Sequence, residues 1–92
     1  MAILNLLYSV SKDPTRPNVW RQLSIAYGRL NEKGESSQAL AEEAILLGRN
    51  NEAIKLAERA KKLLKTGTSN WLRAEDIINL AHINLKKRKV RK

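Results

Sequence analysis

The feature that most constrains the fold of this chain is an internal period of 34 residues. Shifting the sequence by 34 aligns apolar or small residues: Leu6 with Leu40 and Ala74, Val10 with Ala44 and Ile78, Val19 with Ala53, Leu23 with Ala57, and Ala26 with Ala60. Periods of about 20–50 residues are typical of repeated structural units that bury their apolar sides against one another. Small residues at the matched positions would let neighbouring backbones approach closely.

The spacing of apolar residues predicts five helices, and no segment shows the sustained alternation of a strand. The predicted ranges are about 2–12, 19–30, 35–47, 50–65 and 69–86. Pro14 ends the first helix because the residue before a proline disfavours helical backbone. Asn18 is the predicted N-cap of the second helix. Gly48 is a predicted left-handed C-cap, and Gly67 closes the fourth helix.

These elements predict an all-α fold class of antiparallel helical hairpins, about five helices stacked as part of an α-α superhelix. The predicted domain covers 1–85, with hairpins at about 1–33 and 34–67 and a final helix at about 69–86; residues 86–92 form a basic tail. A chain of this size buries only roughly 60–65% of its unfolded surface, so its core is thin. We expect four large side chains to pack inward: Leu40, Leu56, Trp20 and Trp71.

The unit from 34 to 67 resembles a tetratricopeptide repeat. The residues at consensus-like places are Leu40, Ala41, Ala44, Gly48, Ala53, Ala57 and Ala60. Two positions depart from the pattern, because Ser37 replaces a large aromatic residue and Lys65 replaces a closing proline. The alternative is an irregular helical bundle with accidental spacing.

A second resemblance covers about 14–80. It rests on W-R-Q-L-S-I-A-Y-G-R-L at 20–30, A-L-A-E-E-A at 39–44, A-E-R-A at 57–60 and W-L-R-A-E-D-I at 71–77. These segments resemble the C-terminal repeat region of bacterial zinc metalloproteases that join an H-E-x-x-H catalytic domain to tetratricopeptide repeats. The resemblance implies a region that engages substrates or assembly partners. It also implies a periplasmic location and a role in outer-membrane protein assembly and quality control.

The residues predict no catalytic site, metal site or cofactor in this chain. His82 is the only histidine and there is no cysteine, so H-E-x-x-H chemistry and a zinc site with several ligands have no residues to build them. Two pairs of adjacent carboxylates occur, at 42–43 and 75–76. Neighbours on a helix point about 100° apart, so neither pair is expected to converge on one substrate atom. We therefore expect a non-enzymatic, protein-binding chain.

The predicted site is a groove lined by the first helix of each hairpin. Seven residues face it in the predicted register: Asn5, Tyr8, Gln38, Glu42, Arg73, Asp76 and Asn79. A shifted register would replace them with Arg21, Gln22 and Arg29, and a third possibility is that these are ordinary solvated helix faces. The expected partner is a protein or peptide, the preceding repeats or the catalytic domain of a parent protease, or a second copy bound through exposed helical ends.

The formal net charge of +9 is concentrated at the C-terminus. Six basic residues form the predicted anionic-contact site: Lys86, Lys87, Arg88, Lys89, Arg91 and Lys92. One interpretation is a disordered solubilising tail, and another is a minimal nuclear-import pattern. The alternative function is a small basic protein that binds nucleic acid or anionic membrane through this tail.

The start of the chain lacks the basic and small-residue regions of a signal peptide. No apolar run approaches the roughly 20 residues that a membrane-spanning helix needs. We therefore expect a cytoplasmic protein, unless the chain belongs to the periplasmic parent protease.

Overall fold

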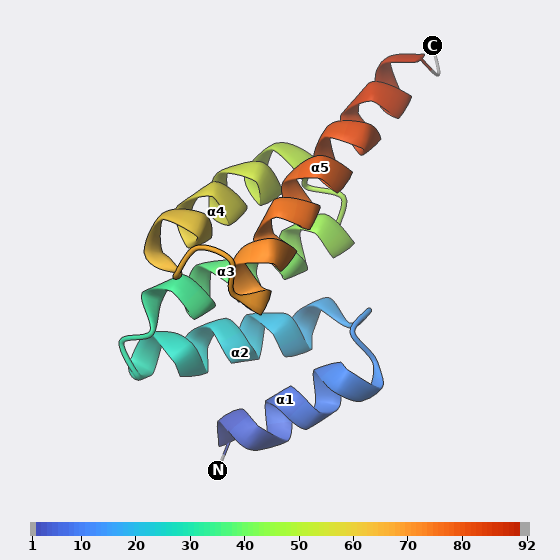
Figure 1. Cartoon of the computed structure of the whole chain (residues 1–92). Helices are drawn as coiled ribbons and strands as arrows, with labels where there is room; N and C mark the ends of the chain where they lie inside the picture. The colour runs from blue at the N-terminus through green and yellow to red at the C-terminus, as the bar shows by residue number, and fades with distance from the viewer. Residues whose placement is uncertain (1, 91–92) are drawn as a thin grey trace.

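The computed structural model describes residues Ala2–Val90, and it is all-helical over that range (Figure 1). The five predicted helices are present, with bounds shifted by a few residues: α1 Ala2–Lys12, α2 Pro17–Arg29, α3 Lys33–Leu46, α4 Asn50–Leu63 and α5 Ser69–Val90. None of these helices is both long enough and apolar enough to cross a membrane.

The start of α2 differs from the prediction. Arg16 is the N-cap and Pro17 is the first helical residue, so the expected N-cap role of Asn18 is wrong. The physical reason is that proline has its backbone dihedral φ already fixed near the helical value and needs no hydrogen-bond acceptor for its nitrogen. The helix therefore begins one residue before Asn18, which lies within its first turn.

Three tight turns separate the later helices, and each contains a residue with positive φ. Gly48 follows α3 with φ 76°, as its predicted left-handed role requires. Gly67 also has a positive φ, 86°, but α4 already ends at Leu63 with Leu64 as its C-cap, so the prediction that Gly67 closes this helix is wrong. Asn31, with φ 60°, adopts the left-handed conformation between α2 and α3. Asparagine tolerates this left-handed conformation better than most residues that carry a Cβ.

Consecutive helices run in opposite directions, and cross-helix contacts establish the register. Between α2 and α3, Arg21 bonds to Glu43 whereas the later Ser24 lies against the earlier Ser36. Between α4 and α5, Asn84 donates to Asn50 at one end of the pair, and Lys61 meets Glu75 at the other. Because α4 reverses the chain, α3 and α5 run in the same direction, and they also contact each other.

The main core is built from small residues where α3, α4 and α5 meet. Its buried members are mostly alanines: Ala41, Ala44, Ala53, Ala57, Ala60, Ala74 and Ala81, with Ile45 and Ile77. Leu56 packs against this core but is only half-buried, and so is Leu40, contrary to the expectation that these leucines form its centre. Alanines at the crossing points bring the helices close together, which leaves larger side chains at the edges of the contact.

A second core cluster joins α1 to the rest of the molecule. Val10 of α1, Leu23 of α2 and Ala39 of α3 are buried together, with Val19 beside them. Trp20 is half-buried against this cluster and its indole nitrogen donates to the backbone oxygen of Pro14 at 2.8 Å. The hydrogen bond ties the loop after α1 to the first turns of α2.

The C-terminal segment differs from the predicted tail. Helix α5 continues to Val90 and includes Lys86, Lys87, Arg88 and Lys89, which were expected to lie in a frayed, separate segment. Lysine and arginine are good helix formers, and their charges interact favourably with the negative end of the helix dipole. The end of α5 thus projects from the body of the molecule (Figure 1). With this helix included, the structure measures 47 × 26 × 18 Å along its principal axes.

The close approach of α3 to the end of α4 predicts opposite effects for two glycine substitutions. A Cβ added to Gly34 would lie 2.8 Å from Leu64 Cδ2 and 3.3 Å from the backbone carbon of Leu63. We expect Gly34→Ala to lower the free energy of unfolding by about 1–3 kcal/mol, because overpacking outweighs the gain in helix propensity. Urea denaturation followed by circular dichroism measures the change.

Gly28→Ala is the matched control, because a Cβ at Gly28 has only Ser36 Oγ nearby, at an ordinary contact distance of 3.7 Å. This variant should be more stable than the wild type by about 0.5–1 kcal/mol, since alanine is the better helix former. Equal stabilities for the two variants would contradict the close packing of α3 on α4.

Candidate functional site

Three of the seven predicted groove residues form one hydrogen-bonded cluster between α3 and α5. Arg73 donates through Nε to Glu42 Oε2 at 2.7 Å and through Nη2 to Glu42 Oε1 at 2.9 Å. Gln38 Nε2 donates to Glu42 Oε2 at 3.0 Å. The exposed fractions of Gln38 and Glu42 are only 4% and 5%. These two side chains are therefore used inside the structure and are not displayed to a partner.

The chemistry of Glu42 sets the orientation of the cluster. A carboxylate only accepts hydrogen bonds, so the amide nitrogen of Gln38 must face it and the amide oxygen must face away. That oxygen is buried and has no partner within the described part of the chain. The bidentate pairing raises the pKa of the Arg73 guanidinium above its ordinary value, chiefly through the hydrogen bonds to Glu42.

The adjacent carboxylate Glu43 faces a different helix. It accepts a hydrogen bond from Arg21 Nε of α2 at 2.7 Å, which raises the pKa of Arg21. Glu42 and Glu43 thus bind arginines of different helices, α5 and α2, as expected for helical neighbours that point about 100° apart. They do not converge on a common point, and their charges are compensated within the fold.

The other four predicted groove residues are exposed on two separate helices. Asn5 and Tyr8 lie on α1, and Asp76 and Asn79 lie on α5. Tyr8 is 64% exposed, and Lys12 Nζ lies 5.4 Å from the centre of its ring. The structure does not bring these residues into the Gln38–Glu42–Arg73 cluster.

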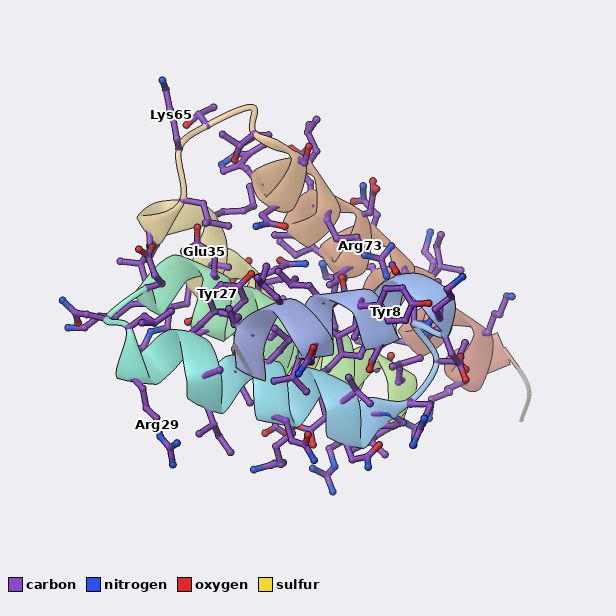
Figure 2. The ribbon with its side chains drawn as sticks, turned by 90° about the horizontal axis from the view of Figure 1, so that it is seen from below. Tyr8, Tyr27, Arg29, Glu35, Lys65 and Arg73 are labelled. Atoms are coloured by element: carbon purple, nitrogen blue, oxygen red, sulfur yellow. The ribbon has the colours of Figure 1, made fainter. Side chains whose placement is uncertain are left out.

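The alternative set of predicted groove residues, which a shifted helix register would place in the groove, consists of three residues of α2. Arg21 is paired with Glu43, Gln22 is exposed, and Arg29 is exposed and extends away from the body of the molecule (Figure 2). These three side chains do not form a common cluster. Among the described contacts, the polar cluster with the most hydrogen bonds belongs to the first register.

A small enclosed cavity of about 100 Å³ lies beside Gln38. Its walls come from α1, α2 and α3 and from the first turn of α5, and they include Leu7, Val10, Tyr27, Glu35 and Asn70. Burial is the main cause of the raised pKa of Tyr27, followed by the nearby negative charge of Glu35.

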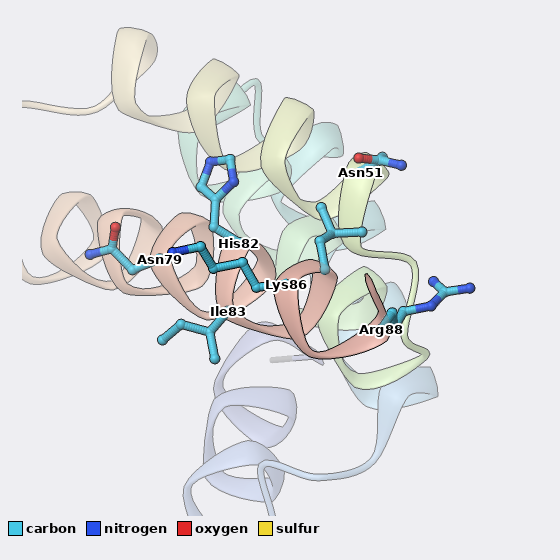
Figure 3. A pocket seen from close by; sticks show the side chains of 7 residues that line it. Asn51, Asn79, His82, Ile83, Lys86 and Arg88 are labelled. Carbon is cyan, nitrogen blue, oxygen red and sulfur yellow. The ribbon is translucent and has the colours of Figure 1, made fainter. Parts of the chain in front are cut away.

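A much wider hollow of about 1080 Å³ lies along the C-terminal half of α5 (Figure 3). We call it the α5 hollow; it is lined by Asn79, His82, Ile83, Leu85, Lys86 and Arg88 of α5 and by Asn51 of α4. Two residues of the predicted anionic-contact site, Lys86 and Arg88, therefore share a surface with Asn79 of the predicted groove. Lys87 is exposed, whereas the side chain of Lys89 and the whole of Arg91 and Lys92 lie outside the described residues.

Sequence reasoning missed the exposed apolar residues of α5. Leu72, Leu80 and Ile83 are each 42–50% exposed, although only the buried stripe of this helix was singled out from its spacing. The sequence does contain a signal for this exposed face. Leu72 and Ile83 lie outside the buried stripe, and because they are 11 residues, or about three turns, apart, they point to the same side of the helix. Trp71 is also less buried than expected and stacks under Lys61, whose Nζ lies 4.6 Å from the ring centre.

The described residues contain no group of three or more histidine, aspartate or glutamate side chains that could hold a metal ion. His82 is exposed in the α5 hollow. Comparison with known proteins found no matching family model, no matching curated protein and no matching solved structure.

The different hydrogen bonding of the two ion pairs, bidentate for Arg73–Glu42 and single for Arg21–Glu43, predicts different costs of breaking them. Arg73→Ala leaves the buried Glu42 carboxylate with only the Gln38 amide, so we expect the free energy of unfolding to fall by about 2–3 kcal/mol. Arg21→Ala is the matched control and should cost less, since it removes one hydrogen bond to a carboxylate and not two, from a pair of similar exposure. Urea denaturation of both variants checks the order, and a larger loss for Arg21→Ala would contradict it.

Proposed function

We propose that this chain is a non-catalytic protein–protein interaction module of tetratricopeptide type. The observation that carries the proposal is that α5 lies beside α3 while α4 contacts both helices. This is the arrangement expected of stacked helical hairpins, in which equivalent helices of successive units become neighbours. The bidentate pairing of Arg73 of α5 with Glu42 of α3 supports it, because it joins these two neighbouring helices directly.

The proposed partner is a protein or peptide that contacts the exposed side chains of α1 and α5. Asn5 and Asn79 supply amides that both donate and accept hydrogen bonds, Asp76 accepts them, and Tyr8 adds an exposed aromatic ring. The Gln38–Glu42–Arg73 cluster holds α3 and α5 at a fixed spacing beneath this surface. A non-catalytic role is also supported by the carboxylates of Glu42 and Glu43, which are both committed to arginines.

The resemblance in sequence extends the proposal to a parent protein. We infer that the chain is the C-terminal repeat region of a zinc metalloprotease whose H-E-x-x-H domain lies elsewhere in the parent, and that the parent acts in the periplasm. In that setting the module engages substrates or assembly partners, or docks on preceding repeats or on the catalytic domain. Acting by itself, it would be a cytoplasmic adaptor without a cofactor.

Sequencing the native coding DNA upstream of Met1 tests the parentage. An in-frame segment that encodes H-E-x-x-H and an export signal is the expected result. A stop codon and a ribosome-binding site directly upstream would instead establish a free-standing adaptor, and the metalloprotease assignment would be wrong.

The binding surface is tested by selecting peptides from a displayed random library and titrating the best binder by calorimetry. We expect the double variant Tyr8→Ala/Asn79→Ala to bind at least about tenfold more weakly, because each change removes side-chain contacts from an exposed binding surface. The control Lys55→Ala/Arg59→Ala alters exposed residues of α4 and should bind within about twofold of wild type. Equal losses in both variants would contradict the assigned surface.

The end of α5 favours a second candidate function, contact with nucleic acid or an anionic membrane. Lys86, Lys87 and Arg88 are exposed on a helix that projects beyond the body of the molecule. A projecting basic helix can approach a phosphate-rich surface without obstruction by the rest of the fold.

This candidate predicts a steep salt dependence. If about six phosphates are neutralised, the logarithm of the association constant for duplex DNA should fall with the logarithm of salt concentration with a slope near −5. Fluorescence anisotropy with labelled duplex DNA, and co-sedimentation with anionic vesicles, measure it. The variant Lys86→Gln/Lys87→Gln/Arg88→Gln should bind far more weakly with a shallower slope, and a slope near zero for wild type would exclude this function.

A further inference from the structure

The outward side of α5 carries a wide hollow and exposed apolar residues. Helix α5 contacts α3 and α4 through one side only, along Ala74, Ile77 and Ala81. No helix of the described chain covers the opposite side of α5. The α5 hollow lies along this helix, with Asn51 of α4 at its edge (Figure 3). The hollow is wide and open, which suits an extended macromolecular element better than a small metabolite.

The apolar residues of this surface have the spacing that a partner helix requires. Ile83 is 50% exposed and lies in the hollow, and Leu72 is 49% exposed on the same side of α5, 11 residues earlier. Eleven residues correspond to three helical turns, or about 16 Å along the axis. An amphipathic helix lying along α5 could place apolar side chains on both positions at once.

The charges of the hollow select the chemistry of the partner. Among the described residues that line it, Lys86 and Arg88 are cationic, His82 and the asparagines are polar, and none is acidic. Asp76 lies on the same side of α5 as Leu72 and Ile83, one turn after Leu72 and two turns before Ile83, and Glu75 is paired with Lys61. Carboxylates on the partner would therefore find complementary charge beside Ile83 and would be repelled near the start of α5.

We propose that the outward face of α5 from Leu72 to Arg88 binds an acidic amphipathic helix of a partner protein. This inference rests on the proposed protein-binding function and names the class of partner. Nucleic acid fits less well because Ile83 and Leu85 place apolar surface in the middle of the hollow. A second copy of this chain also fits less well, since each copy carries a net charge of +9 and the same basic helix end.

A synthetic peptide of 18 residues tests the inference directly. It carries leucine at positions 3, 7, 10 and 14 and glutamate on the flanking positions, and two controls replace every glutamate with lysine or scramble the order. Fluorescence anisotropy with the full chain should show binding of the acidic amphipathic peptide at least about tenfold tighter than either control. Equal binding of the three peptides would overturn the inference.

Variants of the chain locate the site. Ile83→Glu should weaken binding of the acidic peptide at least about tenfold, and Lys86→Glu/Arg88→Glu should reverse the preference toward the lysine peptide. Leu30→Glu is the matched control because Leu30 is an exposed apolar residue at the end of α2, and it should bind like wild type. All four positions are exposed, so melting curves should stay close to wild type and confirm that the variants fold.

The remaining outcomes also decide the matter. Concentration-dependent dimerisation in sedimentation that Ile83→Glu abolishes would make a second copy the occupant and would overturn the proposal. Unchanged peptide binding in Ile83→Glu would overturn it as well. If a library-selected peptide binds and depends on Tyr8 while the acidic peptide does not bind, the protein-binding function stands and only this inference fails.

Discussion

The structure depends on the burial of α3, which is enclosed by α2, α4 and α5. Helix α3 is buried along most of its length, and its buried residues include alanines as well as the polar side chains of Gln38, Glu42 and Glu43. The alanines allow close approach of three neighbours. The two carboxylates can be buried only because an arginine from α2 and another from α5 reach them. The ion pairs therefore link the central helix to both of its flanks.

This arrangement separates the polar residues of the molecule into two groups with different roles. Glu42 and Arg73 bond to each other and so link α3 to α5; the Glu42 carboxylate is buried, whereas Arg73 uses two of its five N–H groups on it. The exposed residues on the surface of α1 and along the outward side of α5 form the second group, and they are accessible to a partner. A binding function, if carried by this chain, must use that second group, because displacing the first would expose a thin core of alanines.

The helical bounds could be predicted well because local residues decide them. Pro14, Gly48 and Gly67 interrupt the backbone at positions where proline and glycine have strong conformational preferences. The misplaced N-cap at Asn18 has the same kind of cause, since Pro17 already meets the needs of a first helical residue. The end of α5 was harder to predict because a run of lysine and arginine is compatible with both helix and solvated tail.

Local sequence features were sufficient to predict that this chain is all-α, how its helices are divided, and where the positive charge lies. Helix type and helix boundaries can be predicted because they depend on apolar periodicity and turn residues that are close together in the sequence. Which polar residues at the predicted groove are exposed depends on how the helices pack together, and it could not be predicted from local features. Glu42 is buried because Arg73, 31 residues later, lies against it, and Ile83 stays exposed because no described helix covers that side of α5. Burial depends on neighbours distant in the chain, and a helical period specifies a face but not what packs against it.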